Sequence, residues 1–236
     1  CVISLSKMKT HALERITGAV KNSYGFIYGF HKAKGHTQYP SADSFARMLI
    51  DLNKCVATKL YVMDGIVAME GNGPGSGDPV PMNVLLMSTD PVALDSIFSR
   101  LVYLKPEMVP TNYHGEKMGL GTWKEEEITL LTPDGEISMA EAVKKYGNPA
   151  FNVDRTEVRK NIWTRMAGAL NIFQKKPYIE ADKCVRCGIC VQSCPVPGKA
   201  VDFRKGKGKP PVYDYRKCIR CFCCQEMCPK KAIKVK

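Results

Sequence analysis

Cysteine is the residue type with the clearest chemical pattern in this chain. Nine of the eleven cysteines lie between residues 184 and 228, and eight of them form two copies of one spacing that are 34 residues apart. The copies are Cys184-x2-Cys187-x2-Cys190-x3-Cys194-Pro195 and Cys218-x2-Cys221-x2-Cys224-x3-Cys228-Pro229. Thiolates bind iron and zinc, and a Cys-x2-Cys-x2-Cys loop can present three of them to one metal group. The repeat therefore indicates two metal centres.

This spacing is the one with which bacterial ferredoxins bind two [4Fe–4S] clusters, the fourth cysteine of each copy ligating the other cluster. The predicted ligand sets are Cys184, Cys187, Cys190 and Cys228 for one cluster and Cys218, Cys221, Cys224 and Cys194 for the other. Cys223 falls outside the spacing and is predicted to be a non-ligating thiol. A zinc site favours two Cys-x2-Cys pairs separated by a loop over triplets of cysteines. Disulfide bonds would need an export signal, and the sequence does not show one. Whether an organic cofactor joins the clusters is left open.

The positive charge is concentrated in the same part of the chain. Of a formal net charge of +12, residues 175–236 carry 16 Lys and Arg against 5 Asp and Glu, whereas residues 1–174 carry 19 against 18. Two clusters with their thiolates would add about −2 each, which leaves this part basic. Such a surface favours an acidic redox partner of the ferredoxin or flavodoxin type, or an anionic substrate. Nucleic acid is disfavoured because the interleaved aromatic side chains of a single-strand binder are missing.

The elements that must position these residues alternate along the first part of the chain. Apolar runs predict strands at 2–5, 59–69, 84–87 and 128–131, and helical spacing predicts helices at 11–21, 41–57, 90–103 and 138–146. This alternation predicts an α/β domain with a layered, mostly parallel sheet over residues 1–150. A helical connector over 151–176 and a small two-cluster ferredoxin domain of α+β type over 177–236 follow. No apolar run is long enough to span a membrane.

Polar residues that could do chemistry follow the predicted strands of the α/β domain. Lys9, His11 and Lys21, with Asn22, would form a positive pocket for an anionic substrate or cofactor, unless they are a solvated basic surface. Glycine at every second position from Gly71 to Gly77 would let a ligand approach the backbone, unless this is only a surface loop.

Four carboxylates and one amide complete the candidate site. Asp64 and Glu70 could handle protons, and Asn72 lies in the glycine-rich loop. Asp90 is a good helix N-cap, and Asp95 could face the site. We therefore predict Asp64, Glu70 and His11 as catalytic candidates. The substrate-binding candidates are Lys9, Lys21, Asn22, Asn72, Asp90 and Asp95. Three further histidines, His31, His36 and His114, are interpreted as surface residues.

Several phrases of the sequence, in order, resemble the domain-of-unknown-function family numbered 362: KMKTH, TGAVKN, MDGIVAMEGNGPGSG, STDPVALD, GLGTWKEEEI and KKPYIEADKCVRCGICVQSCP. The resemblance implies a cytoplasmic iron–sulfur protein, typical of anaerobic prokaryotes, whose α/β domain has no assigned reaction. The family's distinctive polar positions fall on Lys9, Thr10, His11, Lys21, Asn22, Asp64, Glu70, Asn72, Asp90 and Asp95. Family members usually have a further α/β segment before the first phrase, so an N-terminally truncated domain is expected.

Two functional hypotheses follow from these patterns. The first is a redox enzyme or electron-input subunit, in which the two clusters pass single electrons to a substrate or cofactor site in the α/β domain. The second is a non-catalytic electron carrier or adaptor, whose α/β domain docks partners. The two differ in whether Lys9, His11, Lys21, Asp64 and Glu70 converge on one site.

Overall fold

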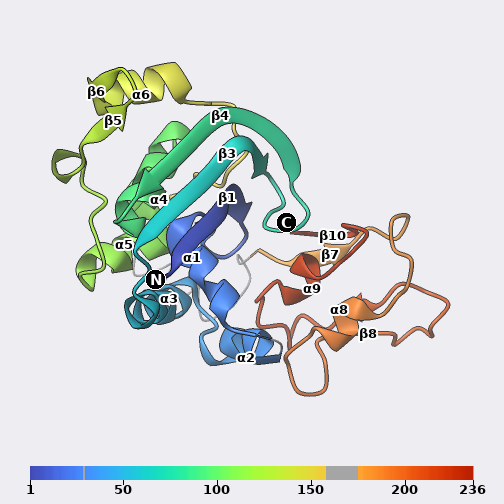
Figure 1. Cartoon of the computed structure of the whole chain (residues 1–236). Coiled ribbons are helices and arrows are strands. Elements are labelled where there is room, and N and C mark those ends of the chain that lie inside the picture. Colours follow the sequence, from blue (N-terminus) through green and yellow to red (C-terminus); the bar gives the residue numbers. More distant parts are fainter. Residues whose placement is uncertain (29, 158–174, 236) are drawn as a thin grey trace. The chain divides into compact units, whose positions relative to one another are not determined.

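The computed structural model describes residues 1–28, 30–157 and 175–235, which divide into two compact units, Cys1–Asp154 and Arg155–Lys236 (Figure 1). The first unit ends close to residue 150, where the sequence predicts the end of the α/β domain. Most of the predicted connector over 151–176 lies outside the described residues.

A four-stranded sheet with the order β2–β1–β3–β4 forms the centre of the first unit (Figure 1). Its strands are β1 (Ile3–His11), β2 (Arg15–Thr17), β3 (Leu60–Glu70) and β4 (Asp78–Ser88). β1 runs parallel to β3, whereas β1–β2 and β3–β4 are antiparallel. The predicted layered α/β domain is confirmed, and its sheet is mixed rather than mostly parallel, because β3 and β4 form one long hairpin.

Six helices accompany the described part of this sheet: α1 (Ala19–Asn22), α2 (Phe30–Gln38), α3 (Ala42–Val56), α4 (Pro91–Leu101), α5 (Pro110–Lys117) and α6 (Met139–Tyr146). Short 3-10 turns occur at Ser23–Phe26, Pro106–Met108 and Glu125–Glu127. A small hairpin pairs β5 (Leu130–Thr132) with β6 (Gly135–Ile137). Among the described residues, no helix has both the length and the apolar character needed to cross a bilayer.

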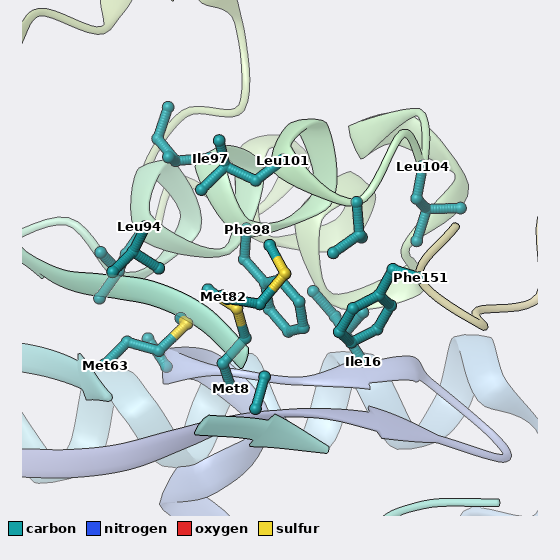
Figure 2. Close-up of a cluster of buried hydrophobic side chains, with 14 of the residues drawn as sticks. Met8, Ile16, Met63, Met82, Leu94, Ile97, Phe98, Leu101, Leu104 and Phe151 are labelled. Atoms are coloured by element: carbon teal, nitrogen blue, oxygen red, sulfur yellow. The ribbon is translucent and has the colours of Figure 1, made fainter. Parts of the chain in front are cut away.

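The core of the first unit lies between the sheet and α4 (Figure 2). Met8 on β1, Met63 on β3 and Met82 on β4 meet Phe98 and Leu101 of α4, and all five side chains are buried. α4 is held in place at its first turn, where the Asp90 carboxylate accepts hydrogen bonds from the backbone N–H groups of Val92 and Ala93. α3 begins in the same way at Ser41, with a reciprocal capping box to Ser44.

The segment predicted as a helix over 11–21 folds differently. The chain turns after β1, enters the short strand β2 and becomes helical only at α1. The His11 side chain causes the turn, because its Nδ1 accepts hydrogen bonds from the backbone N–H groups of Leu13 and Glu14 at 3.2 and 3.0 Å. Arg15 then takes the left-handed backbone conformation, at φ 65°. Apolar residues at helical spacing are therefore divided among a turn, a strand and a helix.

One face of the sheet carries exposed apolar side chains, including Leu5 on β1 and Met87 on β4, which are 76% and 64% exposed. The strand register places Leu5, Val62 and Met87 in one row across the sheet. Lys7 and Asp64 lie opposite each other in the next row of the same pairing. Asp64 therefore lies in the middle of β3, on an open surface, and not at a strand end.

The second unit consists of two similar halves. Each half runs from a strand through a cysteine loop and a short helix to another strand. The first contains β7 (Pro177–Ile179), α8 (Ile189–Gln192) and β8 (Val201–Asp202), and the second contains β9 (Val212–Tyr213), α9 (Cys223–Glu226) and β10 (Ile233–Val235). β7 pairs with β10 and β8 with β9. Each two-stranded sheet thus takes one strand from each half.

Candidate metal centres and a buried polar cluster

Two cavities in the second unit are each lined by four cysteines. The first cavity is lined by Cys184, Cys187, Cys190 and Cys228 among others. The second cavity is lined by Cys194, Cys218, Cys221 and Cys224 among others. Each cavity therefore brings together three cysteines of one spacing and the fourth cysteine of the other.

The repeated backbone explains how each loop can present three cysteines to its cavity. Residues within the two loops take left-handed conformations at matching positions, Arg186 and Gly188 in the first loop and Arg220 and Phe222 in the second. These conformations reverse the chain between successive cysteines, so that their side chains converge on one side. The crossed strand pairing brings in the fourth cysteine of each cavity. It places the chain after α9, with Cys228, beside the first half, and the chain after α8, with Cys194, beside the second half.

Backbone amides are directed at the cysteine sulfurs. The N–H of Ala200 donates to Cys194 Sγ and the N–H of Ala232 donates to Cys228 Sγ, both at 3.3 Å. Backbone N–H groups also hydrogen bond to Cys190, Cys218 and Cys221. Such donors stabilise a thiolate, or a metal-bound sulfur, over a neutral thiol.

Burial opposes ionisation of these thiols. It raises the pKa of Cys190 to about 11, and the neighbouring Cys184, Cys187 and Cys228 add to the effect. The pKa values of Cys218 and Cys224 are raised for the same reason. Crowded cysteine side chains with amide donors directed at their sulfurs fit a site in which a bound cationic group balances the negative charge of the thiolates.

The residues that line each cavity match the ligands of an iron–sulfur cluster. Four cysteine side chains surround each cavity, together with apolar side chains such as Ile179 in the first and Val201 in the second. A [4Fe–4S] cluster requires four thiolates at the corners of such a space, and the residues present fit that group.

Side chains of the second half also contact the sulfurs of the second cavity. The Tyr213 hydroxyl lies 3.1 Å from Cys224 Sγ, and burial raises the pKa of Tyr213, which keeps the phenol protonated. The Cys223 side chain hydrogen bonds to Cys221 and lowers the pKa of the Cys221 thiol. Cys223 is buried but is not among the residues that line the second cavity. The sequence motif did not reveal Tyr213, which lies outside the cysteine spacing.

In the first unit, the structure brings only some of the predicted site residues together. Along β3, Asp64 and Glu70 are six residues apart, which is roughly 20 Å in a strand. Asp64 forms an ion pair with Lys7 at 2.5 Å, and the Lys7 ammonium lowers the pKa of the carboxyl. Glu70 accepts a hydrogen bond from the backbone N–H of Asn152 at 2.7 Å. Both carboxylates therefore have structural partners and do not share a site.

The other predicted carboxylates also hold the fold together. Asp90 caps α4 and accepts a further hydrogen bond from the backbone N–H of Thr122 at 2.9 Å. Asp95 is fully buried and accepts from the backbone N–H groups of Ala19 and Val20, at 2.5 and 3.0 Å. Burial raises the pKa of Asp95 to about 7, although these two donors oppose the change.

The glycine-rich loop packs on the end of β1. Thr10 Oγ1 donates to the carbonyl of Gly71 and accepts from the N–H of Gly73, at 3.0 and 3.2 Å. A Cβ atom on Gly73 would lie 2.1 Å from the Thr10 carbonyl oxygen, so only glycine permits this approach. Lys9 and Asn72 both lie at this end of the sheet, since Lys9 is in register with Met69 at the end of β3 and Asn72 lies within the loop. Asn22 lies on α1, and its Nδ2 donates to Ser4 Oγ at 3.3 Å.

A carboxyl group that sequence reasoning missed lies between two predicted residues. Glu14 is completely buried, and neither of its carboxyl oxygens has a hydrogen-bond partner among the described residues. Its backbone N–H donates to His11 Nδ1, and Lys21 lies close enough to lower its pKa. Burial outweighs Lys21 and raises the pKa of Glu14 well above its usual value. We call His11, Glu14 and Lys21 the buried polar cluster, of which Lys21 is the half-buried member.

Two histidines differ from their prediction as surface residues. His36 is 3% exposed and stacks on Phe45, with ring centroids 4.5 Å apart. His114 is 8% exposed, and its Nε2 lies 2.9 Å from Asp43 Oδ1. A single histidine is not part of a repeating hydrophobic pattern, so its burial cannot be predicted from the sequence. Tertiary packing decides whether such a residue is buried.

Comparison with known proteins finds matches to both parts of the chain. Residues 1–100 match the family described as a domain of unknown function, DUF362, and residues 176–229 match the 4Fe-4S dicluster domain. The predicted resemblance is confirmed over these residues. Among curated proteins, the thylakoid-associated protein sll1697 of Synechocystis is 40% identical over 120 residues, which are 50% of this chain and 37% of that protein. The chain thus matches little more than a third of the relative's length. No solved structure matches. The dicluster match supports an iron–sulfur electron-transfer role.

Proposed function

We propose that the second unit binds two [4Fe–4S] clusters and transfers electrons one at a time. The observation that carries this proposal is the pair of cavities, each lined by three cysteines of one loop and one cysteine of the other. Cys184, Cys187, Cys190 and Cys228 hold the cluster of the first cavity, and Cys218, Cys221, Cys224 and Cys194 hold that of the second. When bound, each cluster takes up and releases one electron.

The chain's own residues prepare the two cavities for this role. The amides of Ala200 and Ala232 offset negative charge on the fourth cysteine of each set. Apolar side chains such as Ile179 and Ile189 in the first cavity, and Val201 and Phe222 in the second, limit the access of water to the sulfurs. Cluster binding requires reduced cysteines, which a reducing compartment maintains, and we propose a cytoplasmic location on that basis.

The exposed basic side chains of the second unit are proposed to attract an acidic redox partner of the ferredoxin or flavodoxin type. Lys205, Lys207 and Lys209 are exposed on the segment between β8 and β9, and Lys217 and Lys230 are exposed beside the cysteine loops. Like-charged partners are repelled and acidic ones are steered towards the clusters. An anionic substrate would be attracted by the same charge.

A second candidate function extends the first: electrons end at a substrate or cofactor site in the first unit. The buried polar cluster favours this function. Burying the Glu14 carboxyl without a hydrogen-bond partner among the described residues costs folding free energy, and a functional role would explain why such a group is present. In this proposal Lys21 and His11 bind an anionic group and Glu14 handles a proton. Asp64 has no part in it, because it lies on the exposed face of β3.

The first experiment is to purify the protein without oxygen and to measure iron, acid-labile sulfide and organic cofactors in one sample, together with the EPR spectrum after reduction. About eight iron and eight sulfide per chain are expected for two clusters. Stoichiometric zinc with little iron would contradict the proposal. An organic cofactor at one equivalent would support an electron terminus in the first unit, and its absence would favour the carrier alone.

A further inference from the structure

The two halves of the second unit differ at positions that contact the cysteine sulfurs. The 34-residue offset matches Ile179 with Tyr213, each five residues before the first cysteine of its loop. Ile179 lies on β7 and lines the first cavity, and Tyr213 lies on β9 and lines the second. The same offset matches Ile189 with Cys223. At both positions the first half has an apolar side chain and the second half has a hydrogen-bond donor.

Tyr213 is placed to donate to a cysteine sulfur. Its hydroxyl lies 3.1 Å from Cys224 Sγ, within the range of a hydrogen bond to sulfur. A phenol is protonated at neutral pH, and a metal-bound thiolate can only accept, so the direction of the hydrogen bond is settled once a metal is bound. Isoleucine at position 179 has no donor to offer Cys190, the cysteine that corresponds to Cys224.

A hydrogen bond to a ligand sulfur changes the reduction potential of an iron–sulfur cluster. Reduction adds one electron and therefore one negative charge, part of which lies on the thiolate sulfurs. A donor at such a sulfur stabilises the reduced state more than the oxidised state and raises the potential. The hydroxyl proton stays on the tyrosine oxygen throughout, so the step requires only one electron from a low-potential donor.

We propose that Tyr213 raises the reduction potential of the cluster in the second cavity. Because the first cavity has Ile179 at the matching position, the reduction potentials of the two clusters then differ. This inference rests on the proposed function, because it requires both clusters to be present. Tyr213 is a tuning residue here and not a ligand. The pair gives electron flow a direction, since an electron then favours the second cavity over the first.

Other features of the two cavities act on the potentials as well. Arg220, in the second loop, is 8% exposed, whereas its counterpart Arg186 is exposed, and a buried cation also favours reduction of the second cluster. Cys187 of the first cavity is exposed, and contact with water favours reduction of the first cluster. A test must therefore compare variants at one position, and not only the order of the two potentials.

The test is an EPR-monitored redox titration of the intact protein, purified anaerobically, as wild type and as Tyr213→Phe. We expect one potential to fall by about 59 mV, which is a tenfold change in the equilibrium constant of a one-electron reduction, while the other stays unchanged. The matched control is Tyr215→Phe. The Tyr215 ring stacks on Tyr213, but its hydroxyl donates to the Pro177 carbonyl at 2.9 Å and not to a cysteine. This control should leave both potentials in place.

The reverse substitution tests the same idea at the other cavity. Ile179→Tyr is expected to raise the potential that Tyr213→Phe leaves unchanged. If Tyr213→Phe keeps eight iron atoms and shifts neither potential, or shifts both equally, the inference is wrong. If that variant loses iron, the result for Ile179→Tyr decides. An unchanged reduction potential of the first cluster in Ile179→Tyr would then overturn the inference. A wild-type protein without two clusters would instead contradict the proposed function.

Discussion

Asp95, a predicted substrate-binding residue, has structural partners in the fold. Its carboxylate accepts hydrogen bonds from the first two N–H groups of α1, which have no acceptor within the helix because the first turn of any α-helix leaves its N–H groups unpaired. Gly18 makes this approach possible, since a Cβ atom there would lie 1.9 Å from Asp95 Oδ1. Asp95 thus connects α4 to the start of α1.

The raised pKa of Asp95 predicts that stability falls with increasing pH. The folded state keeps a proton up to about pH 7, whereas the unfolded state releases it near the ordinary value of 3.8. The contribution of Asp95 to the free energy of unfolding is therefore fully present below about pH 4 and is lost as the pH rises towards 7. Above that pH its effect no longer changes. Glu14 contributes with the same sign. Urea unfolding of wild type and Asp95→Asn between pH 5 and 8 should show a smaller pH dependence in the variant, and equal slopes would contradict this.

The cysteines provide a residue-level test within one loop. Cys221→Ser should lower the iron content from about eight to about four atoms per chain, because one cluster loses a ligand. Cys223→Ser, two residues away, should keep the full iron content, since Cys223 lies outside the second cavity and serine retains a hydrogen-bond donor. Cys55→Ser on α3 is a control remote from both loops. Iron loss in Cys223→Ser would show that Cys223 is a ligand.

At this scale the sequence predicted which four cysteines gather around each cavity, and their role as ligands stays a prediction. In the first unit, Asp64 and Glu70 were predicted to act together and lie far apart along β3. Cluster ligands lie on local loops, so their spacing in the chain reflects their spacing around the metal. Glu14 and Tyr213 were missed because burial and contact with a sulfur depend on tertiary packing. Asp64 shows the converse, since an acid next to a glycine suggested chemistry where the structure has an ion pair with Lys7 on the sheet surface.

Among the elements, those with a local stop or start signal were predicted closely. α3, α4 and α6 begin after Ser41, Asp90 and Ser138, and each of these side chains accepts a backbone hydrogen bond at the start of its helix. β1 extends well beyond its apolar start, to His11, because its later residues alternate between the core and the surface. The helix predicted over 11–21 failed because hydrophobic period alone does not detect a side chain that turns the backbone.

The contact between the glycine-rich loop and β1 predicts a specific sensitivity to substitution. Gly73→Ala should destabilise the protein by about 1–3 kcal/mol or more, because the new methyl group would collide with the Thr10 carbonyl and force the loop away. Gly25→Ala is the matched control, since a Cβ atom there meets nothing within 4 Å. Chemical unfolding of both variants measures the difference. Equal stabilities would show that the loop does not depend on this contact.

At the scale of the whole molecule, the charge is divided unequally along the chain. Residues 175–236 hold 16 of the 35 basic residues but only 5 of the 23 acidic ones. Composition alone revealed this asymmetry, because charge counts need no fold. Where the basic side chains gather on the surface was not predictable, since that depends on how the fold places the exposed lysines around the cavities.

This asymmetry predicts how electron transfer responds to salt. The rate of cluster reduction by an acidic ferredoxin or flavodoxin should fall as ionic strength rises, because salt screens the attraction. Replacing Lys205, Lys207 and Lys209 by Glu should slow the reaction at low salt. The control variant replaces Lys59, Lys117 and Lys144, all exposed in the first unit, and changes net charge equally. Stopped-flow absorbance measures both. Equal slowing would mean that only net charge matters and that the second unit has no docking face.

The exchange of strands between the two halves limits how the second unit can be divided. β7 needs β10 and β8 needs β9, so a chain cut between residues 202 and 212 yields two fragments that each lack the partner of both their strands. Two copies of a single half, however, would supply every strand the pairing requires, related by a twofold axis. The unit is therefore the covalently joined equivalent of a symmetric homodimer of one half, and a half-length peptide is expected to self-associate rather than fold alone.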